Sequence, residues 1–121
     1  EDKMDKYKYL LEQGKNAKKF PEEYRKEAFL VSGCQAQVWL VPSFKNGILE
    51  FYSDSDAFIS KGMVTILCDI YGGKKPNEII KSNFEKLNIL DLDNILTPSR
   101  RNGVHSMLNY IKKYAEDYKN N

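Results

Sequence analysis

Apolar residues recur three or four positions apart in three long segments, the spacing that predicts helices: residues 1–14, 53–71 and 97–118. The polar run 53–56 is typical of a helix start, because Ser and Asp side chains can cap the free N–H groups of a first turn. Thr97 or Ser99 is expected to cap the last helix in the same way. The middle helix carries apolar residues on more than one stripe, so we expect it to be central and largely buried. Gly62, inside that helix, predicts a close approach to a sheet.

Between the first two helices the pattern changes to short apolar runs of β-favouring residues: 29–31, 36–41 and 48–53. Asn46-Gly47 is a strong hairpin signal, because a type I′ turn needs positive φ at both central positions. Gly33 separates the first two runs, and Pro42 is expected to interrupt the pairing before the turn. Trp39 and Val38 should lie on opposite faces. These features predict a three-stranded antiparallel meander.

The order of helix, strand meander and further helices predicts an α+β domain with helices packed on a small three-stranded antiparallel sheet. Pro21 and Pro76 each predict a short additional helix, since proline suits the first helical position. The segment 84–96 is expected to form short helical turns at the surface. The 121 residues show no repeat or linker, so we expect residues 1–121 to form a single domain.

Composition and charge exclude several kinds of function. The chain has 19 Lys and Arg against 17 Asp and Glu, and the two signs alternate, so it lacks the concentrated basic surface that nucleic-acid binding needs. It has no run of 18 apolar residues, so no membrane-spanning helix is expected. Neither Cys34 nor Cys68 has a Cys or His at a metal-ligand spacing, so we expect no zinc or iron–sulfur site on this chain.

Cys34 is the first candidate for chemistry, because Gly33 allows a bend that would present the next side chain in a turn. From the pattern alone, the commoner role for such a cysteine is that of a small buried hydrophobe. A cysteine hydrolase would need the only histidine, His105, as its base, and a dithiol oxidoreductase would need a second cysteine where Gln37 stands. A sulfur acceptor needs only one thiol that attacks a sulfur atom, so that chemistry suits this chain best.

Two further positions carry weaker signals. Cys68 lies inside the apolar middle helix and is interpreted as a core residue. Arg100 and Arg101 stand at the start of the last helix, where a cation opposes the helix dipole. This pair indicates either a binding partner or a solvated surface.

Residues 33–39, GCQAQVW, resemble the GCQSQVW signature of the SufE-type cysteine desulfuration proteins. Residues 53–62, SDSDAFISKG, are similar to the family's GDSDA…KG segment, and residues 96–103, LTPSRRNG, resemble its LTPSR…G segment. Ala36 replaces the usual Ser and Ser53 the usual Gly, and neither replacement removes a chemically needed group. The separated matches occur in the right order and cover nearly the whole chain.

The resemblance implies a SufE/IscU-like fold and a function in sulfur transfer. Such proteins accept persulfide sulfur from a pyridoxal-phosphate cysteine desulfurase of the SufS type, stimulate that enzyme, and deliver the sulfur to an iron–sulfur scaffold complex of the SufBCD type. By position, Cys34 would be the acceptor, and Gly33, Gln35, Asp56 and Arg100 would support the acceptor loop or contact a partner. The chain would hold no cofactor, because pyridoxal phosphate belongs to the desulfurase. It would act as a sulfur carrier and activator rather than as a stand-alone enzyme.

Two alternatives to sulfur transfer stay open at this point. The chain could bind and regulate a desulfurase without chemistry of its own, or it could be an IscU-type scaffold, although that role needs several ligating cysteines. Related proteins occur in bacterial cytoplasm and in plastids. We therefore expect a cytoplasmic protein, or a plastid protein from which a transit peptide has been removed, which the lack of Met at position 1 permits.

Overall fold

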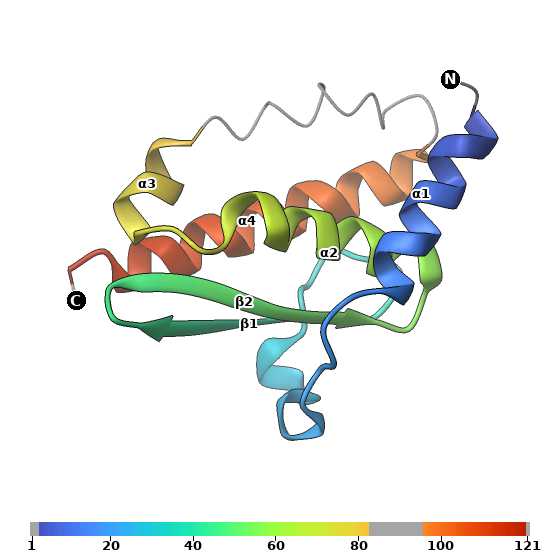
Figure 1. Ribbon diagram of the computed structural model, residues 1–121. Coiled ribbons are helices and arrows are strands. Elements are labelled where there is room, and N and C mark those ends of the chain that lie inside the picture. The colour runs from blue at the N-terminus through green and yellow to red at the C-terminus, as the bar shows by residue number, and fades with distance from the viewer. Residues whose placement is uncertain (1–2, 83–95, 121) are drawn as a thin grey trace.

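The computed structural model describes residues 3–82 and 96–120, and these form an α+β fold (Figure 1). Its elements, in chain order, are α1 (Lys3–Lys15), the 3-10 helices η1 (Glu22–Tyr24) and η2 (Glu27–Phe29), β1 (Val38–Lys45), β2 (Ile48–Ser55), α2 (Phe58–Tyr71), α3 (Pro76–Lys81) and α4 (Pro98–Tyr118). The predicted helices and the Asn46-Gly47 hairpin are confirmed. Nearly all of the segment 84–96, expected to form surface turns, lies outside the described residues.

The prediction of three strands is wrong, because the described sheet contains only β1 and β2. The apolar run 29–31 contributes a single bridge, in which Leu30 lies opposite Trp39 and the Val31 N–H donates to the Val38 carbonyl at 2.8 Å. Before this bridge the chain is wound into η2, and after it Gly33 takes a positive φ of 94°. A segment bent at both ends cannot extend the ladder, so the run ends after one contact.

Pro42 does not interrupt the pairing as expected, since β1 continues through it to Lys45. Pro42 lies opposite Phe51 on β2. Two residues earlier, Leu49 exchanges hydrogen bonds with Gly73 and Lys74 on the side of β2 away from β1. The backbone N–H and C=O groups point to alternate sides along a strand, so those of Phe51, like those of Leu49, point away from β1. The Phe51 carbonyl therefore does not need the N–H donor that Pro42 lacks. The proline therefore occupies the one kind of ladder position that tolerates it.

Side chains alternate between the two faces of the hairpin, and each face belongs to its own apolar cluster. Val38 and Leu40 join the main core beneath α2 and α4, while Trp39 and Val41 pack with Phe20 on the opposite face. Figure 1 shows α2 and α4 on one side of the hairpin and the segment with η1 and η2 on the other. The predicted division of Val38 and Trp39 between the faces is confirmed.

An arginine ties the smaller cluster to the end of β2. The Arg25 guanidinium lies 4.8 Å from the centre of the Trp39 ring and 5.1 Å from that of Phe20. It also donates to the Asp54 carboxylate at 2.8 Å, which Lys61 approaches to 3.5 Å. Because Asp54 precedes the residues that support the Cys34 loop, this ion-pair cluster fixes the strand end from which they project.

The start of α2 differs from the prediction. β2 extends through Ser55, and the first cap position falls on Ala57, which has no side-chain cap hydrogen bond. The Ser and Asp side chains at 55 and 56 support the neighbouring loop instead. Most of α2 is buried as expected, but Phe58 at its first turn is 81% exposed.

Gly62 allows a close approach, although its neighbour is a helix and not the predicted sheet. A Cβ at this position would collide with the backbone of Leu10, and a Cβ on Gly14 would lie in tight contact, 3.1 Å from the Gly62 nitrogen. Two glycines therefore let α1 and α2 cross with their backbones almost in contact. None of the helices in the described ranges is long and apolar enough to cross a membrane.

Candidate functional site

Cys34 lies on a short loop that joins the Leu30–Trp39 bridge to β1. Both ends of the loop are fixed by backbone hydrogen bonds, from Val31 to the Val38 carbonyl at 2.8 Å and from Asp56 to the Gln37 carbonyl at 3.2 Å. Gly33 supplies the positive φ that turns the chain, as the sequence predicted. The loop therefore presents Cys34 as the residue after a bend, between two fixed points.

One face of α4 supports the first half of this loop, through residues three and four positions apart. A hydrogen bond joins the Cys34 Sγ to the Gly103 carbonyl at 3.6 Å. Gly33 lies against Ser106, with too little space there for a Cβ. The Ser32 N–H donates to the Tyr110 hydroxyl at 3.2 Å. Residues at this spacing share one side of a helix, so α4 carries a continuous support for the loop.

The second half of the loop is held from the strand end that precedes α2. The Asp56 carboxylate accepts a hydrogen bond from the Gln37 N–H at 3.0 Å, and the Ser55 hydroxyl donates to the Gln37 carbonyl at 2.8 Å. Asp56, predicted to be near the loop, therefore supports it through the backbone of Gln37.

A cavity of about 250 Å³ lies between this loop and the first turns of α2 and α4. Loop residues Cys34 and Gln35 line it together with Arg100, which is exposed at the start of α4. The remaining wall comes from small and apolar side chains of the loop and both helices: Ala36, Ala57, Ile59, Ser60, Met63, Ser99, Gly103, Val104 and Met107. The thiol of Cys34 therefore borders a small cavity whose wall is largely apolar.

Arg100 is placed by the local structure of the α4 start. The Thr97 side chain accepts a hydrogen bond from the Arg100 N–H at 3.3 Å, so the predicted cap at Thr97 is confirmed. The cap fixes the first turn and directs the Arg100 position to the cavity rim. The structure thus brings Cys34, Gln35 and Arg100 together at one cavity. Gly33 and Asp56 instead fix the backbone of the loop, through its turn and through the Gln37 N–H.

The Cys34 thiol is held in its neutral form at rest. Burial raises its pKa above the ordinary value, because desolvation disfavours the thiolate. The Cys34 Sγ also donates a hydrogen bond to the Gly103 carbonyl, which only the protonated thiol can do. The thiolate is the reactive species, so the closed loop keeps Cys34 quiet.

The alternatives for Cys34 can be compared with this geometry. No histidine is present among the described residues that line the cavity, and His105 lies exposed on α4. Cys34 and Cys68 are free thiols in separate cavities. In the ranges that the structure describes, no three His, Cys, Asp or Glu residues gather as metal ligands. The surroundings of Cys34 offer a thiol, an apolar cavity and one arginine.

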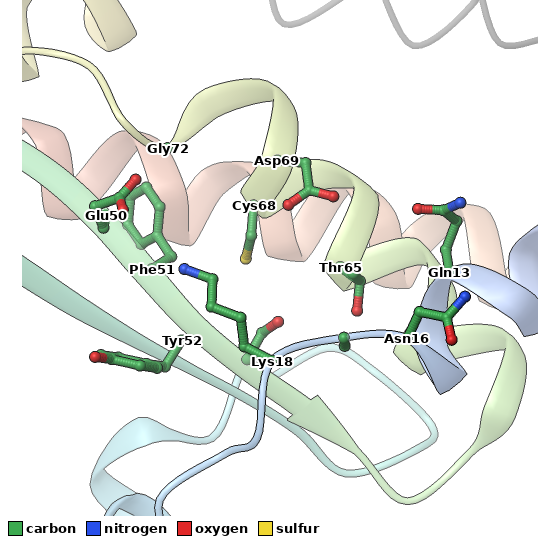
Figure 2. A pocket seen from close by; sticks show the side chains of 12 residues that line it. Gln13, Asn16, Lys18, Glu50, Phe51, Tyr52, Thr65, Cys68, Asp69 and Gly72 are labelled. Atoms are coloured by element: carbon green, nitrogen blue, oxygen red, sulfur yellow. The ribbon is translucent and has the colours of Figure 1, made fainter.

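Cys68 lines a second cavity, of about 230 Å³, between α2, β2 and the segment after α1 (Figure 2). Its thiol points from α2 toward β2, and the Lys18 side chain reaches toward it from the segment after α1. Burial raises the pKa of Cys68 to about 12 in spite of that lysine. The sequence pattern indicates a core residue at this position, and the structure shows a partly buried thiol at a polar-rimmed cavity.

Sequence reasoning missed the part of the site that α4 provides. Ser106 and Tyr110 carry no separate signal within the predicted helix, although with Gly103 they form a stripe at helical spacing. That stripe pairs small and hydroxyl residues, which is a detectable sign of a helix face that supports a chain segment. Which segment it supports depends on tertiary contacts and is not readable from the spacing.

A family model and the curated relatives point to one family. The SufE family model, described as an Fe-S metabolism associated domain, matches residues 1–115. The chain is 37% identical to the cysteine desulfuration protein SufE of Wigglesworthia glossinidia brevipalpis, over 92% of this chain and 78% of that protein. It is also 37% identical to an uncharacterized SufE-like protein of Rhizobium meliloti, over 93% and 84% of the two chains.

A solved structure supports the same fold. The solution structure of a hypothetical protein from Thermus thermophilus matches with a TM-score of 0.80 and covers all of this chain and 89% of its own. The two sequences are only 18% identical, so this likeness bears on the fold alone.

Proposed function

Since this chain belongs to the SufE family, whose role is sulfur transfer with a cysteine desulfurase, we propose that it takes up persulfide sulfur on Cys34. The observation that carries the assignment is the placement of Cys34 on a loop over an apolar cavity, with Arg100 at the rim. A thiol in this position is close to a space that a partner's reactive group can enter. The pyridoxal phosphate that drives desulfuration belongs to the partner.

The transfer step conserves sulfur, protons and oxidation level. The Cys34 thiolate attacks the terminal sulfur of the partner's persulfide, so that a new S–S bond forms to Cys34 and the partner's S–S bond breaks. The partner's cysteine leaves as a thiolate and takes up the proton that Cys34 gave up. Arg100 stands where its charge can stabilise the anionic sulfur species at the cavity rim. The loaded protein then delivers its sulfur to an iron–sulfur scaffold.

Docking of the desulfurase must also expose Cys34, because the resting thiol is neutral and packed against α4. In this proposal the free protein shelters the thiol, and the partner draws the loop outward. Such coupling accounts for a stimulated desulfurase, since removal of its persulfide frees the enzyme for another turnover. Phe58, exposed at the first turn of α2 beside two residues of the cavity wall, offers the partner an apolar contact.

The test is direct loading of the protein with sulfur. The chain is mixed with a cysteine desulfurase and L-cysteine, and mass spectrometry of the peptides locates one added sulfur. We expect it on Cys34, and we expect a folded Cys34→Ser variant to gain none while Cys68→Ser gains as much as the wild type. Persulfide found mainly on Cys68, or on neither thiol, would overturn the assignment.

A second function is favoured by the protonated, packed state of Cys34. The chain would then bind and regulate the desulfurase without accepting sulfur. This alternative predicts that Cys34→Ala stimulates the desulfurase as fully as the wild type does. The sulfur-transfer proposal predicts that the stimulation is lost.

A further inference from the structure

Among the contacts between the Cys34 loop and α4, the hydrogen bonds to Ser32 come from one side chain, that of Tyr110, which has no chemical part in sulfur transfer. Tyr110 contacts Ser32 twice: its hydroxyl accepts from the Ser32 N–H at 3.2 Å and lies 2.9 Å from the Ser32 Oγ. A phenol that accepts from an N–H still has its own proton to donate, so it can satisfy both groups at once. Ser32 is two residues before Cys34, within the segment that must move.

The same loop makes two further contacts with α4. Gly33 rests against Ser106, and the Cys34 Sγ bonds the Gly103 carbonyl through a long sulfur hydrogen bond of 3.6 Å. A thiol is a weak donor, so this bond alone holds the loop poorly. The Tyr110 hydroxyl supplies the strongest hydrogen bonds between the loop and α4 and sits at the end of the loop opposite to Asp56.

The Tyr110 ring is itself held in place by packing. It meets the Tyr114 ring edge-on, with centroids 6.4 Å apart, one turn further along α4. Tyr114 points its hydroxyl elsewhere, donating to the Leu40 carbonyl of β1 at 3.1 Å. Two adjacent tyrosines on one helix thus hold two different segments, the Cys34 loop and the sheet.

We propose that Tyr110 is a positioning residue for sulfur transfer: its hydroxyl holds Ser32 on α4 and thereby keeps Cys34 against the Gly103 carbonyl in the closed loop. To reach Cys34, the desulfurase must break the Tyr110–Ser32 hydrogen bonds. The inference rests on the proposed function for its role in transfer, while the closed loop itself is a property of the free protein. The two parts can therefore fail separately.

The first experiment measures the free protein. Iodoacetamide alkylation of Cys34, followed by mass spectrometry, reports how often the loop opens. Loss of exposed hydrogen bonds of this kind shifts an equilibrium by about three- to tenfold, so Tyr110→Phe should be alkylated about three to ten times faster at Cys34. Ser32→Ala should give a smaller increase, because the backbone N–H of residue 32 still reaches Tyr110.

The matched control is Tyr114→Phe, which removes an equivalent hydroxyl from the same helix. It should leave the Cys34 rate unchanged, and the Cys68 rate should stay constant in all variants, as a monitor of global opening. An unchanged rate in Tyr110→Phe would overturn the inference. An equal increase in Tyr114→Phe, or a parallel increase at Cys68, would also overturn it, because either result means general loosening.

The second experiment adds the desulfurase and measures transfer of sulfur to Cys34. If docking has to break the Tyr110–Ser32 contact, Tyr110→Phe should need about three to ten times less desulfurase for half-maximal transfer, with an unchanged rate at saturation. An unchanged half-maximal concentration would contradict the role in transfer. If the wild type gains no sulfur at all while the alkylation contrast persists, the proposed function fails and the loop contact stands.

Discussion

The two cysteines of this protein both face cavities, but they lie on very different elements of the backbone. Both are partly buried, both face cavities of about 230–250 Å³, and burial raises the pKa of both thiols. Cys34 lies on a loop held by a small number of hydrogen bonds, whereas Cys68 lies within α2, whose backbone is bonded on either side. Partial burial is therefore common to both thiols, although the pKa of Cys68 is raised as far as about 12. The element that carries each thiol separates them further, because it sets how much structure must open before the thiol can react.

The largest expected effect is that of Cys68 on the free energy of unfolding at alkaline pH. The pKa of Cys68 is about 12 in the folded protein, against about 8.5 for an unfolded cysteine. Between these values the unfolded chain releases a proton that the folded chain keeps, so the free energy of unfolding falls as pH rises. From pH 8 to pH 10 the wild type should lose about 2 kcal/mol more than Cys68→Ser, measured by denaturant unfolding.

Below pH 8 both proteins should follow the same pH dependence, since the thiol is then protonated in both states. An identical slope for the two proteins between pH 8 and pH 10 would show that Cys68 is open to solvent. The contrast with Cys34 would then lose its basis.

Two glycine substitutions, one in the Cys34 loop and one in α2, test the contrast between the two thiols through the backbone. Gly33→Ala introduces a side chain at φ 94° and against Ser106, which strains the closed loop by about 1–2 kcal/mol. Opening the loop relieves the strain, so alkylation of Cys34 should rise about 5- to 30-fold while Cys68 stays unreactive.

Gly62→Ala is the counterpart for the rigid region. Its Cβ meets the backbone of Leu10, so α1 and α2 must separate, and the free energy of unfolding should fall by about 1–3 kcal/mol. Any gain in Cys68 alkylation should then match the loss of global stability. A selective gain at Cys34 in Gly62→Ala would mean that the loop depends on the α1–α2 contact.

The same division between local and tertiary causes explains what could be predicted from the sequence. Thr97 as a cap, the Asn46-Gly47 turn and the opposite faces of Val38 and Trp39 follow from contacts within a few residues, and each is confirmed. The prediction of a third strand was wrong because the β-favouring run 29–31 is short and the chain bends at both of its ends, in η2 and at Gly33.

The misassigned residues are those whose partners lie far along the chain. Ser55 and Asp56 have the composition of a helix cap, and only the position of Gln37 shows that they support a loop instead. Gly62 signalled a close approach correctly, but spacing cannot tell that the neighbour is α1 and not the sheet. Cys34, Gln35 and Arg100 were candidates from the sequence and line one cavity, whereas the contact of Tyr110 with the loop is visible only in the structure.

The smallest expected effect concerns the end of the loop that Asp56 holds. Asp56→Ala removes the acceptor of the Gln37 N–H and leaves the bond from the Ser55 hydroxyl to the Gln37 carbonyl in place. A single exposed hydrogen bond contributes about 1 kcal/mol, so Cys34 alkylation should rise about fivefold. Asp69→Ala, which removes an exposed carboxylate beside Cys68, is the matched control and should change the Cys34 rate by less than about twofold. If Asp56→Ala instead leaves the rate unchanged, the loop opens from its Ser32 end alone, and the contacts with α4 by themselves separate an acceptor thiol from an inert one.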